Sequence, residues 1–169
     1  MKKVQDIMTG DVRACLPDTN LAEVVALMVE NDCGVLPVVD EKGMVSGIIT
    51  DRDICIAVAT RGKLASDITV KEVALGIVYT CAATENVGKA LEIMRHAKVR
   101  RLPIVNNDGR LFGILSLNDI ALFAKENGGK EAPEISYKDV ALTLKAVCEH
   151  RTPKTKQEEF EIGVSTASD

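Results

Sequence analysis

The sequence predicts an α/β (α+β) fold in which one β-α-β-β-α unit occurs twice in tandem, followed by a C-terminal amphipathic helix. The main observation is an internal repeat: residues 4–54 align with residues 70–120 at an offset of 66 residues, without a gap. Fourteen of these 51 positions are identical, which indicates a duplication. A unit of about 50 residues is too small to bury both of its helices alone. We therefore expect the two copies to pack sheet against sheet around a pseudo-twofold axis.

Each copy is predicted to begin with a short strand, near residues 12–15 and 78–81, and to continue into a helix. Residues 18–20 and 84–86 are of the types that cap helix N-termini. After them, apolar residues recur with the spacing i, i+3, i+4, i+7 that forms one stripe on a helix. These residues are Leu21, Val24, Val25 and Met28 in the first copy, and Val87, Ala90, Leu91 and Met94 in the second.

A hairpin and a second helix complete each copy. The apolar runs 35–39 and 102–105 are followed by glycine-containing turns, 40–43 and 106–109, and by second strands at 44–49 and 111–115. The second helices are expected to begin at Thr50 and Ser116. Pro37 and Pro103 interrupt the first strands, and because proline has no N–H to donate we expect them at a strand start or on an edge.

The chain divides into four predicted segments: repeat 1 at 1–61, repeat 2 at 62–127, a linker and extra helix at 128–150, and a flexible tail at 151–169. Glycines at 128 and 129 and a proline at 133 separate the second repeat from the extra helix. The tail is polar and lacks periodicity. The helix carries one apolar stripe, which we expect to be covered by the module's own flank or by a second subunit: Tyr137, Val140, Ala141, Leu144, Val147 and Cys148.

Composition excludes several classes of function. A net charge of −4 and a pI near 5.3 argue against nucleic-acid or anionic-membrane partners, which need clustered positive charge. No apolar run approaches membrane-spanning length, and no signal-peptide core follows the first lysines, so we expect a cytoplasmic protein. Five cysteines without a C-x-x-C pair predict buried, reduced thiols instead of a metal site or disulfides. No catalytic motif is found, so we expect no catalytic residues, catalytic cofactor or metal.

The segments 47–53 and 113–119 contain the residues that could bind a ligand or take part in chemistry. In each, a strand ends, a hydroxyl residue opens a helix, and an aspartate follows three residues later: Thr50 and Asp53, and Ser116 and Asp119. One interpretation is a capping box that satisfies free helix N–H groups. The other is a nucleotide site, in which the hydroxyl and helix start bind phosphate and the carboxylate binds a ribose diol. The residues alone leave both interpretations open.

The doubled pattern L-P-V-V-D-E-K-G-x-x-x-G-I-I-T-D-R-D, followed by its second copy near residues 102–119, resembles the CBS domain pair, or Bateman module. The resemblance covers about residues 4–125. It implies a flat pseudo-symmetric disc with two clefts that bind adenosine-type nucleotides such as AMP, ADP or ATP. Each cleft would take its Ser/Thr-x-x-Asp motif from one repeat, and its adenine pocket from the first strand and pre-proline segment of the other.

Carried onto this sequence, the resemblance implies two sets of ligand-binding residues. The aspartates would bind ribose hydroxyls, the hydroxyl residues phosphate, and the apolar residues the adenine faces. The first cleft would contain Ile48, Thr50, Asp53, Val78, Tyr79, Val99, Arg100 and Arg101. The second cleft would contain Val12, Arg13, Cys33, Gly34, Val35, Ile114, Ser116 and Asp119.

The two clefts are not expected to be equivalent. Arg100 and Arg101 stand where the first repeat has Gly34 and Val35, and Arg52 adjoins the first motif. Guanidinium groups suit phosphate oxygens, so the first cleft should prefer a charged nucleotide and the second a nucleoside, a weaker ligand or nothing. The alternative for these arginines is a solvated loop.

Two functions follow from these observations. The first is a non-catalytic regulatory sensor that binds an adenosine-type nucleotide, forms a homodimer and signals to an unknown effector protein, with residues 60–69 as a hinge. The second is a ligand-free structural or dimerisation adaptor with degenerate clefts. A small enzyme is disfavoured because too few residues remain outside the repeats for a catalytic domain.

Overall fold

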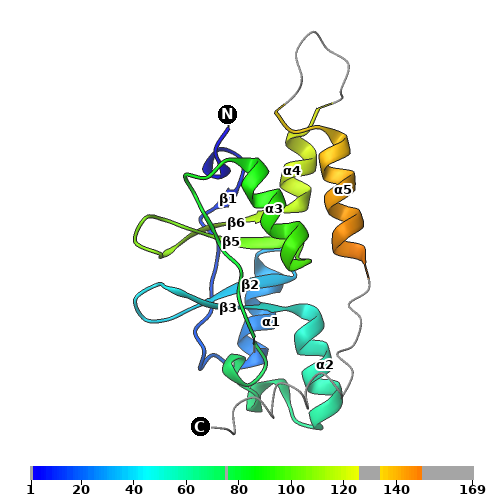
Figure 1. Cartoon of the computed structure of the whole chain (residues 1–169). Helices are drawn as coiled ribbons and strands as arrows, with labels where there is room; N and C mark the ends of the chain where they lie inside the picture. Colours follow the sequence, from blue (N-terminus) through cyan, green and yellow to red (C-terminus); the bar gives the residue numbers. More distant parts are fainter. Residues whose placement is uncertain (1, 75, 126–133, 150–169) are drawn as a thin grey trace, which may run out of the picture.

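The computed structural model describes residues 2–74, 76–125 and 134–149 and contains both predicted units (Figure 1). The first unit consists of α1 (Leu21–Glu30), β2 (Val35–Val39), β3 (Val45–Thr50) and α2 (Asp51–Arg61). The second consists of α3 (Val87–Ala97), β5 (Arg101–Val105), β6 (Leu111–Ser116) and α4 (Leu117–Phe123). Shorter elements precede them: η1 (Val4–Asp6), β1 (Thr9–Gly10), η2 (Ala65–Asp67), η3 (Val70–Glu72) and β4 (Cys81–Ala82). The predicted mixed α/β class is confirmed.

The two hairpins have the same register, as expected for duplicated sequences. Val35 pairs with Thr50 in the first and Arg101 with Ser116 in the second, and both ladders shift one residue before the turn. Gly43 and Gly109 adopt φ angles of +80° and +78° in these turns, a region that favours glycine. A bridge joins Met44 to Arg110, which are equivalent positions of the two copies. The pseudo-twofold axis therefore passes between the hairpin turns.

The prolines lie inside their strands, so the prediction of a strand start or edge was wrong for Pro103. That residue is the third of β5, the strand that pairs with both β6 and β4. In the first unit, Cys15 N donates to Pro37 O at 3.0 Å and Val39 N donates to Cys15 O at 2.9 Å. Pro37 takes part in this short parallel ladder only through its carbonyl oxygen. The N–H that proline lacks would lie before the ladder begins, so no ladder hydrogen bond is lost.

The leading segments of the two repeats are exchanged between the cores. Val4 is fully buried in the core of the second repeat, and its N–H donates to Glu85 O at 2.8 Å. Val70 is fully buried in the core of the first repeat, and its N–H donates to Thr19 O at 2.9 Å. Because each core contains a segment of the other repeat, neither core is complete without its neighbour.

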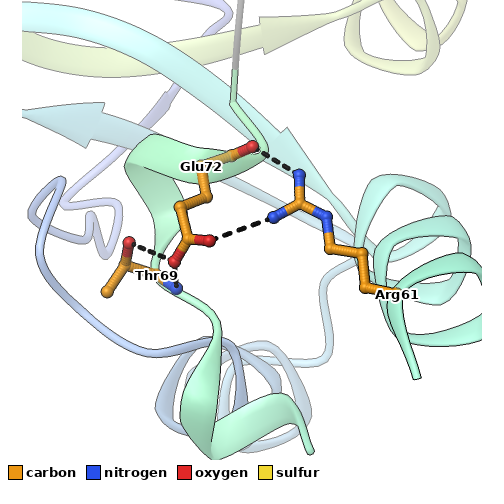
Figure 2. Close-up of polar contacts among 3 residues, drawn as sticks. All are labelled: Arg61, Thr69 and Glu72. Atoms are coloured by element: carbon orange, nitrogen blue, oxygen red, sulfur yellow. Dashed lines mark hydrogen bonds and ion pairs between the residues drawn. The ribbon is translucent and has the colours of Figure 1, made fainter. Parts of the chain in front are cut away.

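The predicted hinge at 60–69 is held at both ends. Ile68 is fully buried in the first core, and its carbonyl accepts from Leu21 N at 2.9 Å. Arg61 donates to Glu72 Oε2 at 3.2 Å and to Glu72 O at 2.7 Å, while Glu72 Oε1 accepts from the amide and hydroxyl of Thr69 (Figure 2). These contacts connect the end of α2 to η3. Thr69 and the Arg61 guanidinium both lower the pKa of the Glu72 carboxyl by favouring its charged form, the hydrogen bonds from Thr69 contributing most.

The first strands differ between the two copies. The predicted strand at 12–15 is reduced to a single bridge between Cys15 and Val38, and the one at 78–81 is replaced by β4 at 81–82. The N-terminal β1 instead pairs with β6, through Thr9 and Ile114 and through Gly10 and Gly113. The resulting sheet has the order β1-β6-β5-β4, whereas β2 and β3 form a two-stranded sheet.

The extra helix, α5 (Tyr137–Cys148), packs against α3 and α4, so the module's own flank covers it. Its buried face differs from the predicted stripe: Thr143 is fully buried and Val140 packs on the second core, but Tyr137 and Leu144 are 57% and 46% exposed. Thr143 is tolerated inside because its hydroxyl donates to Asp139 O and accepts from Arg95. The predicted tail lies outside the described residues. None of the helices in the described ranges has the length and apolar character to cross a bilayer.

The cysteine prediction holds for two residues of five. Cys15 and Cys81 are buried at equivalent positions, and burial raises the pKa of each thiol to about 11. Cys33 is half-buried, whereas Cys55 and Cys148 are exposed, so the prediction of burial was wrong for the last two. All five thiols are free.

Candidate functional site

One cavity of about 410 Å³ lies between the two repeats, where β1 and the turn after α1 face the end of β6. It brings together all eight residues predicted for the second cleft, which come from residues 12–13, 33–35 and 114–119. We call it the second cavity. It also contains residues that sequence reasoning did not assign to this cleft: Thr9, Asp11, Asn31, Asp32, Leu36, Pro37 and Arg101.

Arg101 lies beside Ser116 at the second cavity. Arg101 pairs directly with Ser116 across β5 and β6, so the two residues lie side by side at the end of the hairpin. Arg101 was predicted for the first cleft, and in the structure it also lines the second cavity. Two guanidinium groups, from Arg13 and Arg101, therefore line the same cavity as the Ser116 hydroxyl and the Asp119 carboxylate.

Two aspartates shape the rim of the cavity through their backbone. Asp11 and Asp32 adopt φ angles of +49° and +46°, a region that aspartate tolerates better than most residues. Asp11 follows β1, and Asp32 lies in the turn between α1 and β2. The Asn31-Asp32 pair directly after a helical stripe was the available sequence signal for this turn.

Ser116 and Asp119 form a capping box at the start of α4. Asp119 Oδ2 accepts hydrogen bonds from the Ser116 amide at 2.7 Å and from the Ser116 hydroxyl at 2.6 Å, and Asp119 N donates to Ser116 Oγ at 3.2 Å. In the described residues, Asp119 Oδ1 has no hydrogen bond. The capping and ligand-binding interpretations are therefore compatible, because the capping bonds use one carboxylate oxygen of a residue that lines the cavity and leave the other oxygen without a hydrogen bond.

Thr50 and Asp53 form the same box at the start of α2, with Asp53 Oδ2 accepting from the Thr50 amide at 3.0 Å and the hydroxyl at 2.7 Å. Asp53 also borders a hollow of about 210 Å³ beside Arg61 and Glu72. The other residues predicted for the first cleft are placed one by one: Ile48, Val78 and Val99 are half-buried, whereas Tyr79 and Arg100 are exposed. Leu75, which precedes Val78 and Tyr79 in the chain, lies outside the described residues.

A third copy of the box separates capping from ligand binding. Asp139 Oδ2 accepts from the amide and hydroxyl of Ser136 at 2.9 and 2.6 Å, at the start of α5 and outside the repeats. These bonds lower the pKa of the Asp139 carboxyl by favouring its charged form. A Ser-x-x-Asp box is therefore a helix cap by itself. What distinguishes Ser116 and Asp119 is the cavity and its two arginines.

The described residues contain no group of three or more His, Cys, Asp and Glu side chains arranged to hold a metal ion. The chemistry that the second cavity presents is thus that of hydroxyl, carboxylate and guanidinium groups beside an apolar wall formed by Val12, Val35 and Ile114. Such a set can bind the phosphate, the sugar hydroxyls and the flat base of a nucleotide.

Comparisons with known proteins agree with the duplicated fold. CBS domain-containing protein YhcV of Bacillus subtilis (strain 168) is 31% identical over 83% of this chain and 99% of its own length. Inosine-5'-monophosphate dehydrogenase of Methanocaldococcus jannaschii is 36% identical, but the match spans 71% of this chain and only 23% of that enzyme. The structure of the CBS domain pair of protein MJ0100, in complex with 5'-methylthioadenosine and S-adenosyl-L-methionine, has a TM-score of 0.64 and 27% identity, covering 72% of this chain and 98% of that one.

The family model described as CBS domain matches twice, at residues 4–60 and 65–126, which are the two repeats of the structure. The match to the dehydrogenase is confined to this shared module. The chain therefore belongs to the CBS domain family and contains a tandem pair of CBS domains.

Proposed function

We propose that this chain is a regulatory module, without catalytic activity of its own, that binds an adenosine-type nucleotide such as AMP, ADP or ATP in the second cavity. The observation that carries the proposal is the meeting of Arg13 and Arg101 with Ser116 and Asp119 in one cavity of about 410 Å³. This volume is within the usual range for small-molecule sites, roughly 300–1,000 Å³. The adenosine-containing ligands of the MJ0100 domain pair support the ligand class.

The expected preference of the two clefts is reversed in this proposal. From the sequence, the charged nucleotide was expected in the first cleft because Arg100 and Arg101 were assigned to it and Arg52 adjoins its motif. With Arg101 on the second cavity, two guanidinium groups are available for phosphate oxygens at that site. We therefore assign the phosphate-bearing ligand to the second cavity, and regard Thr50 and Asp53 as the candidate residues of a weaker first site.

We further propose a cytoplasmic homodimer that transmits nucleotide binding to an effector protein still to be identified. A net charge of −4 fits partners other than nucleic acid or an anionic membrane. The alternative is a ligand-free adaptor. One observation favours it: Asp53 and Asp119 already have hydrogen-bond partners in their capping boxes without a ligand.

A thermal-shift and calorimetric screen with AMP, ADP, ATP, adenosine and S-adenosylmethionine separates these two functions. A ligand present at 100 times its Kd should stabilise the protein by about 2.7 kcal/mol. Asp119→Asn should weaken binding at least tenfold, whereas Asp139→Asn, the matched change in the third box, should leave it unaltered. If no nucleotide shifts the melting temperature of the wild type, the adaptor is the correct function.

A further inference from the structure

The helix surfaces of the two repeats differ in one respect. In the second repeat, α5 lies over α3 and α4, and Leu91, Leu117 and Ile120 are at most 6% exposed. In the first repeat, the equivalent surface between α1 and α2 is open and forms a hollow of about 520 Å³. We call this hollow the repeat-1 groove; its lining residues are Val25, Met28, Val29, Asp32, Cys33, Gly34, Asp51 and Ile54.

The repeat-1 groove has an apolar floor and an acidic rim. Met28 and Ile54 form the floor and are each 5% exposed, while Val25 and Val29 on the wall are 40% and 76% exposed. The carboxylates of the rim belong to Asp32 and Asp51, both exposed. Arg95, the equivalent of Val29 in the second repeat, donates a hydrogen bond to Thr143 of α5. Val29 therefore presents an exposed apolar side chain at the position where the second repeat has the hydrogen-bonding Arg95.

Helix α5 has a second apolar face, which is exposed. Tyr137, Ala141, Leu144 and Cys148 follow the spacing i, i+4, i+7, i+11 and are all exposed. We call these four residues the outer face of α5. Lys138 and Lys145, also exposed, lie beside it. An outer face that is apolar and flanked by lysines complements a groove that is apolar and rimmed by aspartates.

We propose that the outer face of α5 from a second copy of this chain packs into the repeat-1 groove, and that a twofold axis repeats the contact to form the homodimer. This inference rests on the proposed homodimer and names its surfaces. In Figure 1, α2 and α5 lie on the same side of the two hairpins, so both surfaces are available to one partner. A contact of groove with groove would bring like charges together at Asp32 and Asp51, and a contact of α5 with α5 would do so at the lysines.

Sedimentation of the full chain and of charge variants tests the proposal. The wild type is expected to be a dimer. Val29→Glu in the groove and Leu144→Glu on the outer face should each raise the dimer dissociation constant roughly 30-fold or more. The matched control is Phe112→Glu, since Phe112 is 48% exposed but belongs to the β5–β6 hairpin, which projects to the opposite side. It should leave the dissociation constant unchanged.

A mixture of the Val29→Glu and Leu144→Glu proteins distinguishes the proposed contact from other dimers. One copy retains an intact outer face and the other an intact groove, so the mixed pair recovers one of its two contacts and should associate more tightly than either variant alone. A monomeric wild type, a dimer that neither variant weakens, or a mixture without recovery would overturn the proposal. Neither residue lines the second cavity, so calorimetry with AMP on the Val29→Glu protein tests nucleotide binding separately.

Discussion

The two repeats share one backbone plan but differ in what covers them. The second repeat receives β1 at the edge of its sheet and α5 over its helices. The first repeat receives neither in the described residues, and its helix surface is the open repeat-1 groove. The difference at the helices arises from α5, which lies outside the duplicated region, and not from the hairpins, whose registers agree residue for residue. Duplication thus accounts for the shared fold, and the added helix α5 makes the two halves unequal.

The difference between the two repeats also affects the candidate site. β1 ends beside the second cavity, so the strand at the edge of the second sheet also brings Thr9, Asp11 and Arg13 to this cavity. Residues 32–34 line both the second cavity and the repeat-1 groove. If the proposed ligand and the proposed second copy bind there, both contact this turn, and such a shared contact would couple the two binding events reciprocally.

The largest effect is expected where α5 covers the second repeat. Val140→Asp places a carboxylate against the second core and should reduce the free energy of unfolding by about 2–3 kcal/mol. Leu142→Asp, on the same helix at a position that is 48% exposed, should change it by less than about 0.5 kcal/mol. Urea denaturation measures both. Equal losses would mean that α5 does not pack on α3 and α4 as described.

A smaller effect is expected at the sheet edge that β1 covers in the second repeat. An alanine Cβ at Gly113 would lie 2.6 Å from Thr9 O and 2.8 Å from Met8 Sδ, so β1 must move. At the equivalent Gly47 the nearest atom is 3.5 Å away. Gly113→Ala should destabilise the protein by about 1–3 kcal/mol, and Gly47→Ala by less than about 0.5 kcal/mol. The same denaturation assay applies, and a Gly47→Ala loss as large as that of Gly113→Ala would contradict the asymmetry.

No difference between the repeats is expected at their equivalent cysteines. Burial raises the pKa of the Cys15 and Cys81 thiols to about 11, so at pH 8 both remain protonated and shielded. Ellman's reagent followed by mass spectrometry should find Cys55 and Cys148 modified first, with Cys15 and Cys81 reacting only after unfolding. Modification of Cys15 well before Cys81 would show that the first core opens independently of the second.

Much of this fold could be predicted because its signals are local and occur twice. The helix stripes, the capping asparagines Asn20 and Asn86 and the glycine turns depend on residues within a few positions of each other. The exchange of Val4 and Val70 between the cores could not be predicted, since it depends on contacts between distant segments. The two-residue β1 is too short for an alternating pattern. The buried face of α5 was misassigned because it includes Thr143. Hydrophobicity alone does not predict that a threonine can be buried when its hydroxyl forms hydrogen bonds inside the protein.

The candidate site was predicted as a set of residue types more reliably than as two separate clefts. The eight second-cleft residues do line one cavity. Arg101 was predicted for the first cleft because it precedes the proline strand of the second repeat, and it also lines this cavity beside its cross-strand partner Ser116. Val35 is paired with Thr50 in the same way and lines this cavity too, so hairpin pairing alone does not decide which cleft a residue reaches. That depends on how the two repeats pack together, which sequence spacing does not give.

Isothermal titration of AMP and adenosine into Arg101→Ala and Arg100→Ala proteins tests the central claim most directly. Arg101 lines the second cavity, and its exposed neighbour Arg100 serves as the matched control. Arg101→Ala should weaken AMP binding roughly 10- to 100-fold, because it removes one charged hydrogen bond to the phosphate. Adenosine has no phosphate, so its binding should be nearly unchanged. Arg100→Ala should bind both ligands as the wild type does. Wild-type AMP affinity in the Arg101→Ala protein, or an equal loss for AMP and adenosine, would contradict a phosphate site in this cavity.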